Sequence, residues 1–380
     1  PSVIFRMGSL FFSYAVFVII LDTFLHGAEQ ADTIAFAGAY LLFVPVFLAV
    51  ATIFMISSGS VVWALAGLAV AYALMATLTG FPLRGEAAGW YSGGGGAALK
   101  YGTLAGAMLV MRKSPIVAVG LLGLASIIAL VELDRSTALI FLGLAVVVVI
   151  KNFWGTPVPS IVNYKRTLIV VLLGLCTIAA FNVLSYHAAV RGLLPAAVSE
   201  KILLQWSHPD GYIVAARPDA YVAFVAAGRR PLLGYGSSAD DPDIRMLFVR
   251  TVSPTMDLRL DAYYRAESGV PLHSGMAAAW VKGGMPGLFL WLYVIGLAAL
   301  TFQATLLWRH PLALALAYSA ITLIYGALFE PSPPRLPHAV YLGIVILVWE
   351  HLRVFRVSMR HNLHMRVDPV SRPAARWFGG

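Results

Sequence analysis

Arginines between residues 187 and 275 are the side chains with the clearest chemical potential. Arg217 stands alone before a proline, whereas Arg229 and Arg230 stand directly before the Pro-Leu-Leu-Gly-Tyr-Gly sequence of residues 231–236. Arginine presents a planar fork of donors that matches phosphate or pyrophosphate oxygens in bidentate fashion. For Arg229 and Arg230 a solvated surface charge is the alternative. The two glycines of the hexapeptide are by themselves more typical of a tight turn than of a phosphate cradle.

His273 and Arg135 are two further candidates, because each lies where a polar segment meets an apolar run. A histidine in this place can titrate near neutral pH and accept a proton from a hydroxyl group. An interfacial histidine bonded to the backbone is the alternative. Arg135, between Asp134 and Ser136, lies at the expected outer end of a span, where charges are costly and face a cavity or a partner. An ion pair with Asp134 or Glu132 is its structural alternative.

Composition indicates that an integral membrane protein must position these residues. Of the 380 residues 59% are hydrophobic and 12% are charged, whereas soluble domains carry about 25% charged residues. The mean hydropathy is +0.80. Apolar runs reach the length of about 20 residues that a helix needs to cross a hydrocarbon core of about 30 Å. They lack the ten-residue alternation of a membrane barrel, so the sequence predicts an all-α, polytopic fold.

Apolar stretches between charged or Pro/Gly-rich breaks predict about ten or more transmembrane helices. They are 8–25, 33–56, 60–81, 97–111, 115–132, 137–150, 167–186, 276–308, 311–329 and 337–352. The run 276–308 is too long for one simple span. Gly283, Gly284 and Pro286 therefore predict a tilt or a break in its first third.

The chain is expected to divide into four parts. These are transmembrane helices over 1–186, one large loop over 187–275, further transmembrane helices over 276–352 and a basic cytoplasmic tail over 353–380. With ten spans, the basic residues of the short loops gather on one side, which the positive-inside rule assigns to the cytoplasm. Both termini are then cytoplasmic, and the loop, with the catalytic or binding residues, is extracytoplasmic. Segments 193–206 and 217–228 of this loop predict short helices against the membrane surface.

Several classes of protein and site are disfavoured. The net charge of +9 needs no nucleic acid to explain it, because much of the excess lies in the tail beside anionic lipid headgroups. Cys176 is the single cysteine and can form no internal disulfide. His361 and His364 have no carboxylate or cysteine near them in the sequence, so no metal site is predicted there. Neither a nucleotide-binding motif nor a Gly-x-Ser-x-Gly elbow occurs, so no cofactor is expected. The first apolar run is expected to be a membrane anchor and not a removable signal.

Together these features resemble the O-antigen ligase and polymerase superfamily, membrane glycosyltransferases that act on undecaprenyl-linked glycans. Its pattern has an arginine before an apolar span, then an arginine followed by Pro-Leu-Leu-Gly-x-Gly, and then a loop histidine. Arg135, Arg217 and His273 occupy these three places in the same order. The family histidine is followed by two glycines at the start of a membrane helix, and here they are Gly284 and Gly287.

The resemblance covers about residues 130–300 and has two departures from the family pattern. Ser274 occupies a position that is often Asn, and Lys282 occupies a position that is often acidic. These departures weaken any transfer of the finer mechanism. The first spans match the superfamily only in hydropathy.

The resemblance implies a metal-independent O-antigen ligase, which transfers a glycan from undecaprenyl diphosphate to a sugar hydroxyl of the lipid A core. The reaction would take place at the periplasmic face of the bacterial inner membrane. Arg135 and Arg217 would hold the diphosphate and stabilise the leaving group, and His273 would accept or orient the acceptor hydroxyl proton. The further candidates for substrate binding are Arg265, Arg229 and Arg230.

Two alternatives stay open at this stage. An O-antigen polymerase or a protein O-oligosaccharyltransferase of the same superfamily would differ only in the acceptor. A transporter or flippase belongs to another class, and it should show paired half-helices or ionisable residues deep within its spans. This chain keeps its ionisable groups mostly at span ends, which favours a transferase. Membrane lipids are expected partners in either case.

Overall fold

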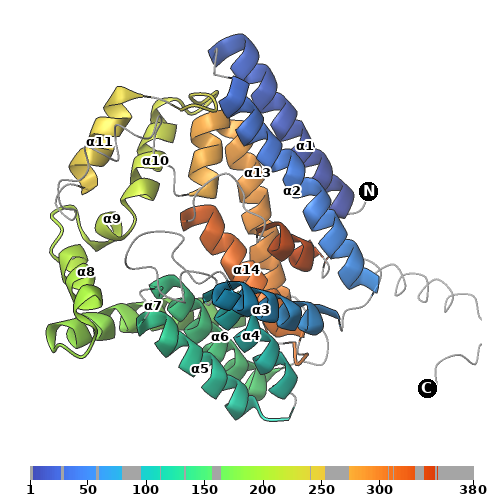
Figure 1. The fold of residues 1–380 in the computed structure, drawn as a ribbon, viewed down its shortest axis with the longest axis vertical. Coiled ribbons are helices and arrows are strands. Elements are labelled where there is room, and N and C mark those ends of the chain that lie inside the picture. The colour runs from blue at the N-terminus through green and yellow to red at the C-terminus, as the bar shows by residue number, and fades with distance from the viewer. Residues whose placement is uncertain are drawn as a thin grey trace, which may run out of the picture.

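In a computed structural model of the protein, all the described elements are helices (Figure 1). The described residues are 3–26, 30–56, 60–78, 96–111, 113–131, 134–155, 164–239, 241–252, 274–306, 308–310, 312–329, 338–346 and 349. The predicted all-α fold is therefore confirmed over this part of the chain. The predicted tail over 353–380 lies outside the described residues.

Long helices form the body of the molecule, and each falls in one of the predicted apolar runs. They are α1 (Val3–Leu21), which the π-helix η1 (Asp22–His26) extends, α2 (Gln30–Ile56), α3 (Ser60–Leu78), α4 (Gly96–Val110), α5 (Pro115–Val131), α6 (Arg135–Trp154), α7 (Tyr164–Val190), α13 (Gly275–Thr305) and α14 (Leu312–Phe329). Residues 338–346 are also helical.

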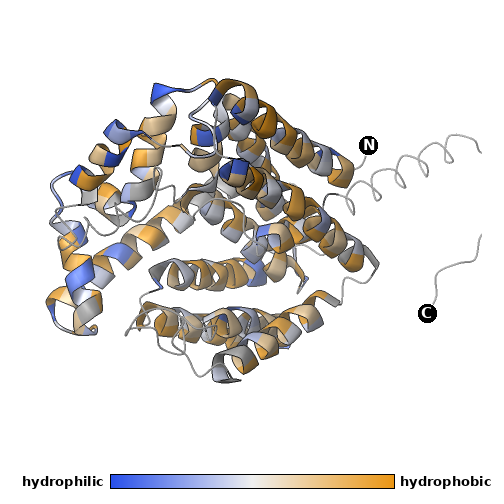
Figure 2. Cartoon of the chain, turned by 45° about the horizontal axis from the view of Figure 1, so that its top comes forward, coloured by the Kyte–Doolittle hydropathy of each residue, from blue (hydrophilic) through white to orange (hydrophobic). Residues whose placement is uncertain are grey.

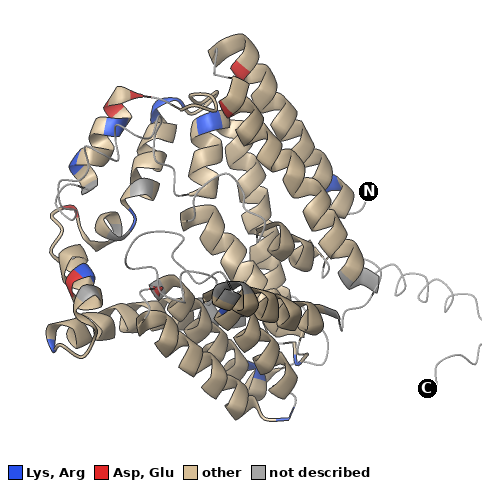
Figure 3. Cartoon of the chain, viewed as in Figure 1, with Lys and Arg blue, Asp and Glu red and all other residues tan. Residues whose placement is uncertain are grey.

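Four shorter helices lie in the described part of the long connection between α7 and α13. They are α8 (Ala196–Trp206), α9 (Tyr212–Ala216), α10 (Pro218–Arg229) and α11 (Pro242–Val252). Helices α8 and α10 confirm the short helices predicted at 193–206 and 217–228. Figure 2 shows that this group is more polar than the long helices, and Figure 3 shows that it carries many of the charged residues.

Six of the described helices are long and apolar enough to cross a membrane. They are Val3–His26, Gln30–Ile53, Ser136–Trp154, Leu172–Val190, Gly275–Thr305 and Leu312–Phe329. The apolar helices Val61–Leu74 and Pro115–Val131 are shorter. The structure therefore supports a multi-pass membrane protein, whereas the count of ten spans and the side on which the loop lies remain predictions.

Helix α14 lies at the centre of the bundle and α7 lies at its edge. In the most apolar 18-residue stretch of each helix, 72% of the residues are buried in α14 but only 17% in α7. Helix α14 packs against α13, α6, α4 and α3, whereas α7 makes few contacts with α6. Because α7 stands away from α6, space is left between α6, α7 and α14.

Helix α13 is broken in its first third, as its glycines and proline predict. Gly284 has φ 64° and ψ −156°, a conformation that only glycine adopts readily, and Pro286 cannot donate a helical hydrogen bond. The 31 residues of α13 rise about 46 Å, which exceeds a hydrocarbon core of about 30 Å. The residues before the break therefore need not cross the hydrocarbon core and can pack outside the bundle.

The hexapeptide of residues 231–236 docks on this break. The Tyr235 amide donates to the Val281 carbonyl over 2.7 Å, and the Met285 amide donates to the Leu232 carbonyl over 3.1 Å. A Cβ atom on Gly284 would collide with the Leu232 carbonyl, so glycine is required for this close approach. Backbone groups freed by the break are thus satisfied within the protein, which a membrane fold requires. Two motifs of the family pattern meet here.

A second core joins the short helices to the first third of α13. It consists mainly of Val222, Ala226 and Ala227 of α10, Ile244 and Phe248 of α11, and Ala277, Ala278 and Val281 of α13. Small side chains on α10 and α13 let the two helices approach closely. This packing fixes the start of α10, where Arg217 lies, relative to the bundle.

Candidate functional site

The N-terminus of α6 is a firmly capped helix end at the edge of the space between α6, α7 and α14. The Asp134 carboxylate accepts from the Thr137 amide over 3.0 Å and lies 3.1 Å from the Lys100 ammonium. Burial by itself would raise the pKa of Asp134, but Lys100 and the hydrogen bonds from Thr137 outweigh it and hold the pKa below its ordinary value. Arg135 is the first residue of α6, and its side chain lies outside the described residues.

Arg217 lies where α9 ends and α10 begins, directly opposite this helix end. Pro218 starts α10, because proline is well suited to the first turn of a helix, and this leaves Arg217 as the N-cap with a non-helical backbone. The guanidinium group donates to the Ser136 hydroxyl over 3.0 Å and also to the Tyr325 hydroxyl. Its carbon lies 5.5 Å from the ring centre of Tyr325 and 5.8 Å from that of Phe329.

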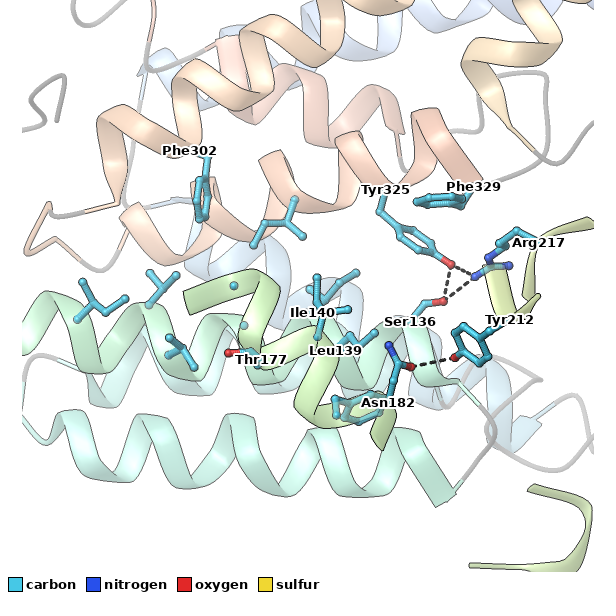
Figure 4. Close-up of a pocket in the computed structure, with 18 residues that line it drawn as sticks. Ser136, Leu139, Ile140, Thr177, Asn182, Tyr212, Arg217, Phe302, Tyr325 and Phe329 are labelled. Carbon is cyan, nitrogen blue, oxygen red and sulfur yellow. Dashed lines mark hydrogen bonds between the residues drawn. The ribbon is translucent and has the colours of Figure 1, made fainter. Parts of the chain in front are cut away.

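An apolar cavity of about 580 Å³ extends from Arg217 between α6, α7, α13 and α14 (Figure 4). Its lining residues are Ser136, Leu139, Ile140, Gly143, Val146, Val147, Ile150, Gly174, Thr177, Ile178, Phe181, Asn182, Tyr212, Arg217, Phe302, Ile321, Tyr325 and Phe329. Those from α6 run from Ser136 to Ile150, which corresponds to about 21 Å of helix. The cavity is therefore long enough to hold a hydrocarbon chain along much of a membrane span.

Most of the polar groups of this cavity gather at one end. Ser136, Arg217 and Tyr325 meet there, and the Tyr212 hydroxyl donates to Asn182 over 2.8 Å beside them (Figure 4). Phe302 lies toward the other end in the same view. Arg217 has no ion pair with a carboxylate whose side chain the structure describes, and its guanidinium group donates to two neutral hydroxyls. Such a charge at the end of an apolar channel suits an anion attached to a long hydrocarbon chain.

His273 and Arg265, two of the residues predicted for the site, lie outside the described residues. Ser274, the residue after His273, is anchored to α14, because its hydroxyl donates to the Ala327 carbonyl over 3.0 Å. The same hydroxyl accepts from the Ala277 amide and caps α13. Ala327 stands two residues along α14 from Tyr325, which contacts Arg217.

The structure does not bring Arg229 and Arg230 to this cavity. Both lie at the far end of α10, about 18 Å of helix from Arg217. Arg229 pairs with Asp243 over 3.8 Å at the surface, and Arg230 lies 4.6 Å from the ring centre of Tyr235. Their role in substrate binding stays a prediction, and it would concern a surface separate from the cavity.

Tyr325 and Ser136 are the functional candidates that the sequence did not reveal. Tyr325 lies inside an apolar run where a tyrosine gives no sign of function, and only the packing of α14 against α6 brings it to Arg217. Ser136 had a weak signal, because it is adjacent to Arg135 at the start of a span. Its hydroxyl also contacts the Tyr325 hydroxyl, so the three side chains form one hydrogen-bonded group.

The described residues contain no group of three or more His, Cys, Asp or Glu side chains that could hold a metal ion. The arginine with its hydroxyl partners is thus the principal charged feature of the cavity. Neither protein-family models nor curated proteins gave a match to this chain.

Proposed function

We propose that the protein is a membrane glycosyltransferase of the O-antigen ligase type. It transfers a glycan from undecaprenyl diphosphate to a sugar hydroxyl of a lipid A core, at the periplasmic face of the bacterial inner membrane. An O-antigen polymerase or a protein O-oligosaccharyltransferase would use the same donor site with another acceptor.

One observation carries this proposal, namely the position of Arg217, which is held by two neutral hydroxyls and has no ion pair with a carboxylate among the described side chains, at the end of a long apolar cavity. A polyprenyl diphosphate has the matching shape, a hydrocarbon chain that ends in two phosphates. The apolar wall would take the first part of the chain, since the cavity is much shorter than the whole lipid. Arg217 would take a phosphate with its planar fork, and Arg135 at the adjoining end of α6 would take the other.

The reaction step follows from this placement. The acceptor hydroxyl oxygen attacks the anomeric carbon of the donor sugar, the bond from that carbon to the diphosphate oxygen breaks, and undecaprenyl diphosphate leaves. Negative charge grows on the diphosphate as the bond breaks, and an arginine held in place beforehand stabilises that charge at little cost in reorganisation. His273 would take the proton that the acceptor hydroxyl releases. The Ser274 hydroxyl is anchored to the carbonyl of Ala327, in the same turn of α14 as Tyr325. This contact supports a histidine acting beside Arg217.

Purified protein in lipid nanodiscs tests the proposal directly. Undecaprenyl-diphosphate-linked glycan and rough lipopolysaccharide, which carries the lipid A core, are supplied together, and the glycan-bearing product and free undecaprenyl diphosphate are measured. Both should appear in equal amounts, and activity should survive excess EDTA. Hydrolysis of the donor without transfer to any acceptor, or export of intact donor across a vesicle, would contradict a transferase.

The acceptor is tested in cells that lack the protein. For a ligase, lipid-linked glycan should persist while lipopolysaccharide loses its long chain. Loss of glycan length with retained attachment of single units would favour a polymerase.

The proposed orientation has its own test. Asp240 in the loop is replaced by cysteine in a variant whose native Cys176 has been replaced by serine. A membrane-impermeant thiol reagent added to intact cells with a permeable outer membrane should label this cysteine. Labelling only after the cytoplasm is opened would contradict the periplasmic site.

A further inference from the structure

Lys151 is a buried cation that the proposed reaction does not use. It lies in the last turn of α6, at the end of the helix opposite Ser136, and its side chain is 3% exposed. Its ammonium group has no hydrogen-bond partner among the described residues. A lysine at the end of a span normally extends its long side chain to water. Burying the charge without a partner is strongly unfavourable, so this position calls for an anion.

Arg309 supplies a second cation at this end of α6. Its guanidinium group donates to the Asn152 carbonyl over 3.3 Å, across the last turn of α6. Arg309 also lies against Gly155, where a Cβ atom would collide both with its side chain and with the Lys151 carbonyl. Gly155 follows Lys151 by four residues and therefore lies on the same face of α6. The face with the buried lysine is thus the face that Arg309 crosses.

The end of the apolar cavity near Ile150, its inner end in the proposed orientation, lies at the same end of α6 as Lys151. Ile150, next to Lys151, lines the cavity together with Val147 and Phe302. The same three side chains pack with Leu306, which precedes Arg309 by three residues. The apolar lining therefore reaches the residue before Lys151 on α6 and the segment of α13 that leads to Arg309.

We propose that Lys151 and Arg309 bind the phosphate of an anionic membrane lipid at the end of the cavity opposite Arg217. The lipid phosphate would supply the missing partner of Lys151, and an acyl chain would lie against Ile150 and Phe302. The positive-inside orientation places this site in the cytoplasmic leaflet, where anionic headgroups attract basic residues. The site is separate from the proposed donor site, and its test does not depend on glycan transfer.

Thermal unfolding in nanodiscs tests the site. The full chain is placed in phosphatidylcholine alone, in phosphatidylcholine mixed with phosphatidylglycerol, and in phosphatidylcholine with inorganic phosphate added. The melting temperature of the wild type should rise by several degrees with phosphatidylglycerol. Lys151→Met should abolish this rise, and it should fold at least as well as the wild type in phosphatidylcholine because it removes a buried charge. Lys113→Met, at an exposed lysine on the same expected side, should keep the rise.

A rise with inorganic phosphate as well would show that the site takes free phosphate as well as lipid. The proposal is overturned if neither anion stabilises the wild type, or if Lys151→Met responds to phosphatidylglycerol as the wild type does. Native mass spectrometry of the wild type gives an answer that needs no variant. Retention of phosphatidylglycerol in preference to phosphatidylcholine supports the site, and equal loss of both contradicts it.

Discussion

The two ends of the cavity along α6 hold their cations in different ways. At the end near Ser136, the outer end in the proposed orientation, Arg217 is oriented by the hydroxyls of Ser136 and Tyr325 and lies against two aromatic rings. At the inner end Lys151 is buried and has no hydrogen-bond partner among the described residues. A cation that neutral groups hold in place is ready for a ligand that comes and goes. A cation without such groups depends on a resident anion, so the outer end suits turnover and the inner end suits a bound lipid.

A third basic group near the cavity shows what a purely structural cation looks like. Lys100 pairs with Asp134, which in turn caps α6, so both charges are satisfied within the protein. Arg217 has no such carboxylate among the described side chains. This difference singles out Arg217 as the candidate anion-binding group at the end of the cavity near Ser136.

The largest effect is expected from His273→Ala. Loss of the proton acceptor should lower the rate of glycan transfer by about 10²–10⁴-fold, with normal insertion and expression. Rates are measured with purified protein in nanodiscs. His187→Ala, at an exposed histidine near the end of α7, is the matched control and should keep the wild-type rate. Near-normal transfer by His273→Ala would contradict the proposed role of His273 as the proton acceptor.

Obstructing the cavity should have the next largest effect. Gly143 lines it, and no atom lies within 4 Å of a Cβ built there, so Gly143→Phe can fold with its ring in the channel. A displaced donor should lower transfer by about 10²-fold, as misplacement of a substrate by about 1 Å can do. Gly120→Phe is the control, since Gly120 also has free space around it but lies on α5 away from the cavity. Equal activity of the two variants would show that the cavity does not hold the donor.

A moderate effect is expected from Tyr325→Phe, which keeps the ring beside Arg217 and removes the hydroxyl. Loss of the hydrogen bonds to Arg217 and Ser136 should lower transfer by about 10-fold, which corresponds to about 1.4 kcal/mol. The loss should be in kcat, because the hydroxyl orients Arg217 toward the leaving group. Tyr293→Phe on α13 serves as the control. An unchanged rate for Tyr325→Phe would mean that Ser136 alone orients the arginine.

The smallest effect concerns the cap of α6. Asp134→Ala should lower the free energy of unfolding by about 0.5–2 kcal/mol, the usual cost of losing an N-cap side chain. Because the folded-state pKa of Asp134 lies below its ordinary value, its stabilisation is complete above that ordinary value and is lost only as the pH falls through the lower folded-state pKa. The difference in stability between wild type and variant should therefore be equal at pH 7 and pH 5, measured by chemical denaturation. A difference that shrinks at pH 5 would contradict the ion pair with Lys100.

The sequence predicted features that depend on local pattern. Apolar runs predicted the long helices, and the glycines and proline of residues 283–286 predicted the break in α13, because these residues act on their own backbone. Arg217 stood out because it precedes a proline in a polar segment. Tyr325 and the buried state of Lys151 could not be predicted, since both depend on how α6 packs against α13 and α14. The distance of Arg229 from the cavity likewise follows from the direction of α10.

Binding of undecaprenyl diphosphate, the lipid part of the donor, to Arg217→Lys tests the central claim most directly. The variant keeps the charge but loses the planar fork that matches phosphate. Affinity for undecaprenyl diphosphate is measured in nanodiscs, with Arg191→Lys, an exposed arginine beyond α7, as the matched control. If Arg217 binds the diphosphate, Arg217→Lys should bind it at least about tenfold more weakly, because one charge-assisted hydrogen bond is lost. Binding by Arg191→Lys should be unchanged. Wild-type affinity in Arg217→Lys, or an equal loss in both variants, would contradict a diphosphate site at the outer end of the cavity.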